Sequence, residues 1–254
     1  MDVERSTRCK DAAIKAADFV RRELYNETTG RLKRIYSKEG RKEDDVGFVD
    51  DYAYMSLAAH AIYDLTFEEI YLDWANKLQE YLNNHFWAET SGGYFQAEKS
   101  TSSDRIINLK PGTDSALPSP NGIIAQNLFY LGSYVPEKKD KYEKMAKDTI
   151  ESFAVEIIQH PFLFVSALGA VVMEAAGIKT MQFGSLVAQE RIRTISGWGR
   201  TVRRMPEGHG IKADEVMICE GDVCRPLREG ELDEMTIDGE EAVDSPKSEV
   251  TATA

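Results

Sequence analysis

The sequence predicts an all-α protein built from stacked helical hairpins. Two observations carry this prediction. Apolar residues recur at three- and four-residue steps through most of the first 176 of the 254 residues, which is the spacing of an amphipathic helix. A helix–turn–helix unit also repeats along the chain, at an offset of 62 residues. Hydrophobic residues make up 42% of the composition, which is enough for a packed core.

Six helices are expected in this region, each marked by its own amphipathic or apolar pattern. They span about residues 10–26, 50–65, 67–87, 121–134, 141–158 and 162–176. Pro161 lies between the last two, where its ring suits the first turn of a helix and excludes a helix interior.

The repeat aligns Phe19–Gly30 with Tyr81–Gly92. In both copies an amphipathic helix ends in aromatic residues, and an acidic–hydroxyl–glycine turn follows. Each glycine is expected to adopt a left-handed conformation that redirects the chain. A short extended segment or hairpin and a polar loop then lead into a second helix, rich in Ala or Ile. The third copy is abbreviated, because its two helices meet directly at His160–Pro161.

Stacked hairpins of this kind form either an open solenoid or a closed (α/α) toroid. The helices that start near Asp50, Asn121 and Phe162 carry smaller, more apolar residues and are expected to form an inner layer. About three hairpins cannot close a ring of six. Open apolar edges are therefore expected, and these could pair with a second copy of the chain.

The helical pattern fades beyond residue 179. We therefore expect a helical domain over 1–179, an irregular segment over 180–228 with one short strand at Val216–Cys219, and a disordered acidic tail over 229–254. The tail carries nine acidic residues and one lysine of a chain whose net charge is −12. The rest of the chain is nearly balanced in charge, so binding to nucleic acid or to an anionic membrane is not expected.

Cytoplasmic localisation is expected from the N-terminal residues and from the number of cysteines. Residues 1–5 lack the apolar stretch of a secretory signal, and three cysteines are too few for a disulfide scaffold. No apolar run approaches the roughly 20 residues that span a bilayer.

Five stretches in order resemble a known family. They are Phe48–Tyr54, Phe86–Phe95, Asp114–Asn121, Ala125–Leu128 and Cys219–Cys224. In this order and spacing they are similar to the C-terminal portion of the thioredoxin-domain-bearing family typified by spermatogenesis-associated protein 20. The resemblance covers about residues 12–226 and is strongest over 47–127.

The resemblance implies a six-hairpin, glycosidase-like (α/α) toroid, related in shape to N-acylglucosamine epimerases and linked to carbohydrate metabolism. The chain departs from the family pattern because it carries no thioredoxin module, no Cys-x-x-Cys pair and only the last hairpins of the toroid. A thioredoxin-like protein is accordingly one expected partner, and a saccharide or polyol is the expected ligand.

Asp50, Asp51 and His60 are the candidate catalytic residues. The two carboxylates lie at the start of an inner helix, where they could act as acid and base or bind sugar hydroxyls. The alternative is helix capping. Epimerases of this shape use histidines for proton transfer, so the resemblance makes His60 the candidate base; the alternative is an ordinary packed histidine.

The candidate substrate-binding residues surround the same helix starts: Tyr52, Tyr94, Asp114, Ser119 and Asn121. Tyr52 and the nearby Tyr54 could stack on a sugar ring, although buried tyrosines are more common. Tyr94 could contribute an aromatic rim, with a tight turn at Gly92–Phe95 as the alternative. The polar residues Asp114, Ser119 and Asn121, at the start of the helix expected from residue 121, could face the toroid cavity. Alternatively, they could form a loop and a helix cap.

Cys219 and Cys224 are a candidate redox pair, with unreactive thiols as the alternative. The histidines and cysteines show no metal-ligand spacing, so no metal site and no cofactor is expected. The function that the resemblance implies is saccharide binding, with epimerase- or hydrolase-like chemistry. The alternative is a non-catalytic interaction module.

Overall fold

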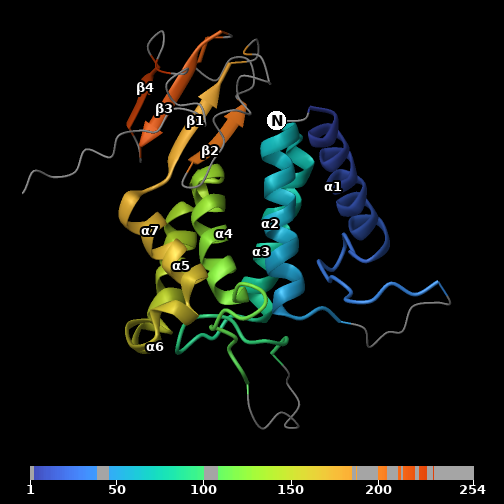
Figure 1. The fold of residues 1–254 in the computed structure, drawn as a ribbon, viewed down its shortest axis with the longest axis vertical. Coiled ribbons are helices and arrows are strands. Elements are labelled where there is room, and N and C mark those ends of the chain that lie inside the picture. The colour runs from blue at the N-terminus through green and yellow to red at the C-terminus, as the bar shows by residue number, and fades with distance from the viewer. Residues whose placement is uncertain are drawn as a thin grey trace, which may run out of the picture.

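The computed structural model describes residues 3–38, 46–99, 108–184, 187, 200–204, 211–212, 214–220, 223–227 and 231. The α-helices in these ranges are α1 (Val3–Glu23), α2 (Val49–Thr66), α3 (Glu69–His85), α4 (Pro120–Tyr134), α5 (Lys139–Glu151), α6 (Ala154–Gln159) and α7 (Val165–Ala176). The strands are β1 (Lys179–Phe183), β2 (Arg200–Arg204), β3 (Val216–Glu220) and β4 (Val223–Pro226). The prediction of a mostly helical chain is confirmed (Figure 1).

Two predicted helices differ in detail from the observed ones. The helix expected over 141–158 divides into α5 and α6. The Ser152 hydroxyl donates to the Thr149 carbonyl oxygen at 2.8 Å, and this side-chain hydrogen bond competes with the backbone hydrogen bonds of the helix. The helix expected from residue 162 begins as a 3-10 turn at Pro161–Leu163 and becomes α-helical at Val165. The first helix begins earlier than expected, at Val3.

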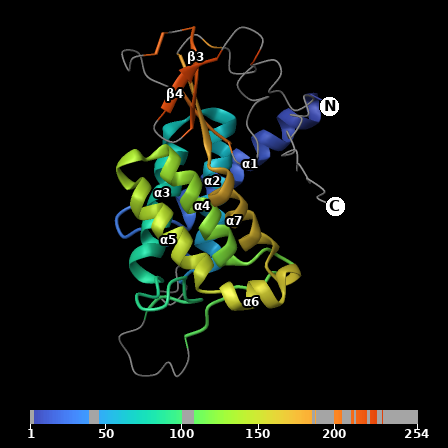
Figure 2. The same ribbon diagram turned by 90° about the vertical axis from the view of Figure 1, so that its left-hand side faces the viewer.

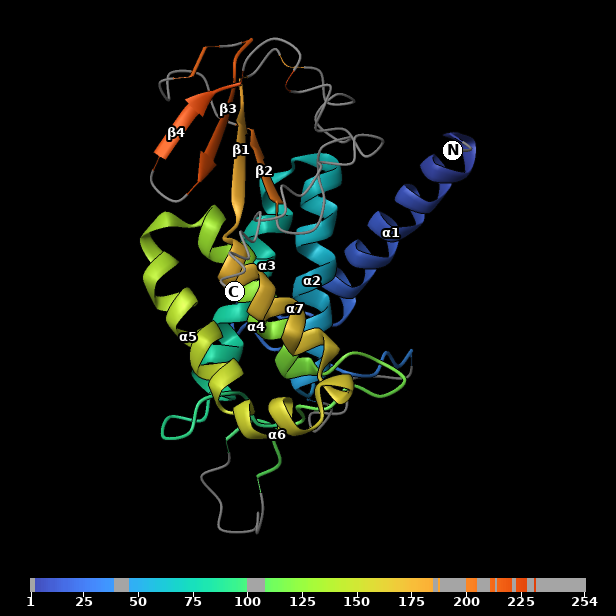
Figure 3. The same ribbon diagram turned by 60° about the vertical axis from the view of Figure 1, so that its left-hand side comes forward.

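The helices form two layers, with α2, α4 and α7 as a central row. In this row α4 packs against both α2 and α7, while α3 covers α2 and α5 covers α4 (Figure 3). The apolar sequences of α2 and α4 suit this position, because both helices are in contact with protein on several sides.

The central helices run parallel. At their first turns, the Tyr54 hydroxyl of α2 donates to the Pro118 carbonyl oxygen just before α4. Near their last turns, the Tyr134 hydroxyl of α4 donates to Asp64 Oδ1 of α2 at 2.6 Å. The chain also leaves α7 at the end of the bundle where α4 ends, and passes there into β1 (Figure 2). The starts of the three helices therefore lie together, as the inner-layer prediction requires.

The internal repeat is confirmed by the backbone. The isolated bridges Tyr25↔Leu32 and Trp87↔Tyr94 join residues that differ by the repeat offset. Gly30 and Gly92, also one offset apart, both have positive φ, at 73° and 65°. In each copy this glycine N–H donates to the carbonyl oxygen four residues earlier, at 2.8 and 2.9 Å. The two turns are thus the same structure built twice.

The C-terminal segment corrects our prediction of one short strand. It contains four strands in the order β2-β1-β3-β4, with β1 and β2 parallel and the other pairs antiparallel. Within β1, Met181 and Phe183 are fully buried and alternate with partly exposed residues, a pattern too short to stand out in a sequence. The acidic tail predicted over 229–254 lies outside the described residues, apart from Glu231.

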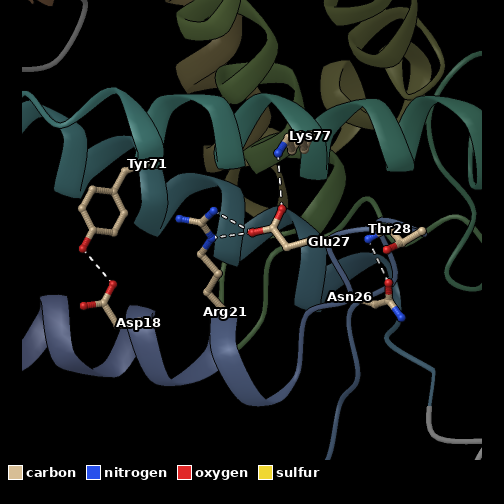
Figure 4. Close-up of polar contacts among 7 residues, drawn as sticks. All are labelled: Asp18, Arg21, Asn26, Glu27, Thr28, Tyr71 and Lys77. Carbon is tan, nitrogen blue, oxygen red and sulfur yellow. Dashed lines mark hydrogen bonds and ion pairs between the residues drawn. The ribbon is translucent and has the colours of Figure 1, made fainter.

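The outer helix α1 is held to α3 by polar contacts (Figure 4). The Tyr71 hydroxyl donates to Asp18 Oδ1 at 2.8 Å. Glu27, in the turn after α1, lies between Arg21 at 2.6 Å and Lys77 of α3 at 3.3 Å. Toward its N-terminus α1 diverges from α2 (Figure 3). Of the described helices, none combines the length and apolar character that crossing a membrane requires.

Candidate functional site

A group of polar side chains lies where the starts of α2, α4 and α7 meet. Asp50, Asp51 and Tyr54 come from the first turns of α2, and Asp114 comes from the loop before α4. Arg34, from the extended segment after the first repeat turn, contacts both α2 carboxylates. We call these five residues the acidic mouth.

The carboxylates of the acidic mouth share one guanidinium. Arg34 Nη1 lies 3.0 Å from Asp51 Oδ2 and 3.3 Å from Asp50 Oδ1. Its guanidinium also lies over the Phe48 ring, 5.1 Å from the ring centroid. Asp51 Oδ2 further accepts a hydrogen bond from the Phe48 N–H at 2.8 Å, so the predicted capping role of Asp51 is confirmed. Asp50 makes no such cap and keeps 36% of its side chain exposed.

The two carboxylates differ in their electrostatic surroundings. Burial raises the pKa of Asp51, and the negative charge of Asp50 adds to this shift. The Phe48 N–H and Arg34 oppose it, because both stabilise the charged carboxylate. Asp51 therefore binds a proton more tightly than an ordinary surface aspartate. The pair thus places a partly buried carboxyl with a raised pKa beside a more exposed one.

Asp114 joins the starts of α4 and α7. It accepts hydrogen bonds from the Ser119 N–H at 2.7 Å and from the Ser166 N–H and hydroxyl at 2.8 and 2.5 Å. The Ser119 hydroxyl oxygen in turn accepts from the Gly122 N–H at 3.0 Å and caps α4. The loop-and-cap alternative is confirmed for both residues. Asp114 remains partly exposed, whereas Ser119 is 1% exposed.

Three predicted substrate-binding residues belong to the core instead. Asn121 is 1% exposed and binds the backbone of Tyr94 and the Pro111 carbonyl oxygen. Tyr94 is fully buried, and its hydroxyl donates to Asn83 Oδ1 at 2.7 Å. Tyr52 is also fully buried and accepts from the Leu32 N–H at 2.8 Å. Because their polar groups bind protein, these side chains do not present a binding surface.

The structure also corrects the role expected for His60. Its side chain is 6% exposed and packs on Tyr130, with ring centroids 4.7 Å apart. Burial lowers the pKa of His60 to about 4, so the ring is neutral at physiological pH. It lies more than two helical turns from Asp51, toward the end of α2 opposite the acidic mouth. The packed-histidine alternative fits this position.

Sequence reasoning missed Arg34, which organises the pair of carboxylates. The available signal was the basic run Arg31–Arg34, placed between the first repeat turn and the two adjacent aspartates. In the part of the chain that the structure describes, no three His, Cys, Asp or Glu side chains are grouped as metal ligands. Cys219 and Cys224 form a disulfide, and their redox role remains a prediction.

About half of the chain is homologous to part of spermatogenesis-associated protein 20. The chain is 33% identical to the Mus musculus protein over 132 residues, which is 50% of this chain and 17% of the relative. It is 34% identical to the Rattus norvegicus protein over 125 residues and 31% identical to the Homo sapiens protein over 132 residues. These matches cover 16% and 17% of the two relatives. The resemblance identified from the five motifs is thus confirmed over this part, and the chain spans less than a fifth of these relatives.

No family model matches the chain. A solved structure of a GH76 alpha-mannanase from Bacteroides thetaiotaomicron is similar with a TM-score of 0.46 and 11% sequence identity. That likeness covers 71% of this chain and 48% of the mannanase.

Proposed function

We propose that the acidic mouth binds a saccharide or a related polyol. The observation that carries this proposal is the shared guanidinium: Arg34 holds Asp50 and Asp51 together at the meeting point of three helix starts. Neighbouring carboxylates accept hydrogen bonds from adjacent hydroxyls of a sugar, and the guanidinium donates to ring or carbonyl oxygens.

Apolar surface beside the acidic mouth supports the same ligand class. The side chains of Phe48 and Leu117 are 37% and 63% exposed, and the partly exposed Tyr54 lies between their segments. A sugar ring offers apolar C–H faces as well as hydroxyls, so a site with carboxylates beside aromatic and aliphatic groups suits it.

The reaction we propose is general acid–base chemistry of the epimerase or hydrolase type. Asp51, whose pKa burial raises, is the proton donor, and Asp50 is the base. This assignment replaces His60, which is buried away from the acidic mouth.

Calorimetric titration with N-acyl sugars and disaccharides tests the binding proposal. We expect heat of binding from at least one of these ligands, and at least a tenfold lower affinity for Asp50→Asn, because the variant loses the charge that Arg34 holds in place. The matched control is Asp140→Asn, which removes an exposed aspartate from the first turn of α5. Absence of heat with every ligand, or equal loss in both variants, would contradict a saccharide site.

A second candidate is a non-catalytic module that associates through its open edge. Phe162, Val165 and Val172 lie on or just before α7 and are 72%, 63% and 47% exposed. A second copy of the chain or a thioredoxin-like partner could cover this edge. Size-exclusion chromatography with light scattering should then give a mass above that of one chain, with return to a monomer for Val165→Lys. A wild-type monomer at all concentrations would exclude self-association.

A further inference from the structure

A cavity lies at the end of the bundle opposite the acidic mouth. The last turns of α4 and α7, together with α5 and the sheet, line a partly open cavity of about 300 Å³. Its apolar part includes Phe129, Met173 and Ile178, and its wall on the sheet side includes both Cys219 and Cys224. The volume is at the lower end of the range for small-molecule sites.

The strand register explains why the disulfide faces this cavity. Thr201, Thr180, Cys219 and Cys224 are paired in turn across β2, β1, β3 and β4. Residues directly opposite one another in a sheet point to the same face. The Ser133 hydroxyl of α4 donates to Thr201 Oγ1 at 3.0 Å, and Thr201 donates to Thr180 Oγ1 at 3.0 Å. The face that carries the row is therefore the face turned toward α4.

The two sulfur-bearing residues differ in access. Cys219, in the interior strand β3, is 4% exposed, whereas Cys224 lies on the edge strand β4 and is exposed. A thiolate must approach a sulfur atom along the line of the S–S bond, so access decides which sulfur is attacked. Cys224 is thus the more exposed residue of the pair, which favours attack on its sulfur over attack on that of Cys219.

The charged side chains around the cavity indicate the kind of thiol. Lys139, Lys147 and Lys179 line it together with Glu143 and Glu174. Basic side chains thus outnumber acidic ones by one among these lining residues, and Lys147 and Glu174 form an ion pair at 3.3 Å. Such a lining favours a small thiol that carries carboxylates over one that carries an amine alone.

We propose that Cys219 and Cys224 form a thiol-exchanging centre whose substrate is a small carboxylate-bearing thiol bound in this cavity. The thiolate of the first substrate molecule attacks Cys224 Sγ and forms a mixed disulfide there. The S–S bond breaks, and its electron pair leaves on Cys219 Sγ, which then takes up a proton. A second thiolate attacks the substrate sulfur of the mixed disulfide, releases the substrate disulfide and leaves Cys224 as a thiolate that is also protonated. Two thiols are oxidised and one protein disulfide is reduced.

The experiment uses the full chain with Cys9→Ser, because Cys9 is an exposed free thiol that would also react. The protein is equilibrated in buffers of glutathione and glutathione disulfide, alkylated, and counted for free thiols by intact mass. We expect a reversible transition between zero and two free thiols. Two free thiols in every buffer, or no free thiol in any buffer, would overturn the proposal.

Two comparisons test the access and the cavity. Glutathione disulfide should modify Cys219→Ser, which retains the exposed Cys224, at least tenfold faster than Cys224→Ser, which retains the buried Cys219. At equal thiolate concentration, glutathione should reduce the unsubstituted disulfide at least threefold faster than cysteamine. That preference should disappear in the Lys139→Gln, Lys147→Gln double variant and persist in the control Lys77→Gln on α3. Equal rates for the two cysteine variants, or for the two thiols, would contradict the assignment.

Discussion

At the scale of single residues, α2 carries a partly buried aspartate and a buried histidine whose pKa values shift in opposite senses. Burial raises the pKa of Asp64 to about 6, although the hydrogen bond from Tyr134 opposes the shift. Burial lowers the pKa of His60 to about 4. Both side chains face Tyr134, which lies with its ring centroid 6.1 Å from that of His60. In both cases the folded protein favours the neutral form.

These shifts affect stability with opposite dependence on pH. Asp64 has a raised pKa, so its contribution is fully present below its unfolded value of about 4 and is lost as the pH rises through about 6. His60 has a lowered pKa, so its contribution is present above its unfolded value of about 6.5 and is lost as the pH falls through about 4. In the wild-type chain the two effects largely cancel between these limits.

Single substitutions should separate the two effects. Relative to wild type, the free energy of unfolding of Asp64→Asn should rise by about 2 kcal/mol between pH 4 and pH 7, because the cost of burying the charged carboxylate is removed. Over the same pH range, the free energy of unfolding of His60→Gln should fall by a similar amount relative to wild type. Urea denaturation at several pH values measures both, and parallel pH profiles for the variants would show that these groups do not titrate as the structure implies.

Residue roles at the acidic mouth could be predicted only in part. The positions of Asp50, Asp51 and Asp114 beside helix starts followed from the sequence, because caps and turns are local features. The burial of Tyr52 and Tyr94 did not follow from the sequence. It depends on Leu32 and Asn83, which lie in other segments of the chain.

At the scale of elements, the contact between α4 and α7 depends on a glycine. A Cβ atom at Gly122 would lie 2.1 Å from Ser166 Oγ and 2.8 Å from the Ala167 backbone nitrogen. The hydroxyl of Ser166 is also fixed by Asp114 at 2.5 Å, so it cannot turn away without losing that bond. The close approach of the two helices, and the position of Asp114, therefore require a residue without a side chain here.

Gly122→Ala should accordingly destabilise the chain by about 1–3 kcal/mol, because overpacking forces the two helices apart. Gly132→Ala, in the same helix, is the matched control. The heavy atom nearest to its Cβ would be the Lys139 Cα at 3.6 Å, so the better helix propensity of alanine should leave stability unchanged or raise it by about 0.5–1 kcal/mol. Chemical denaturation of both variants measures the difference, and equal effects would contradict the tight contact.

The contact between α1 and α3 should be less sensitive to substitution than the contact between α4 and α7. Glu27→Gln removes the charge that pairs with Arg21 and Lys77, but Glu27 is 45% exposed. Exposed ion pairs contribute little, so the loss should stay below about 1 kcal/mol and shrink further in high salt. Thermal unfolding at low and high salt measures this. A large loss that salt does not reduce would mean that α1 depends on Glu27 for more than an ion pair.

Helices were predictable as elements and the sheet was not. The repeat and the apolar periodicity are local signals, and they located the helical segments to within a few residues, α1 and the α5–α6 break excepted. The sheet pairs segments as far apart as Lys179 and Glu220, and its strands have four or five residues each. Pairing of this kind depends on tertiary contacts, which a single short segment does not encode.

At the scale of the whole molecule, the parallel central helices give the chain two distinct ends. The acidic mouth lies where α2, α4 and α7 begin, and the cavity with the disulfide lies where α4 and α7 end. We expect the two ends to act independently, so reduction of Cys219–Cys224 should leave saccharide affinity within twofold. Calorimetry on oxidised and reduced protein tests this, and a larger change would mean that the ends are coupled.

Chemical-shift mapping by NMR shows directly whether a saccharide binds at the acidic mouth. The isotope-labelled full chain is titrated with the tightest-binding saccharide, and backbone resonances are followed. We expect the perturbed amides to cluster at residues 48–54 and 114–119, around Asp50, Asp51 and Asp114. Perturbations centred on the sheet and the ends of α4 and α7, or spread evenly over the chain, would contradict a saccharide site at the acidic mouth.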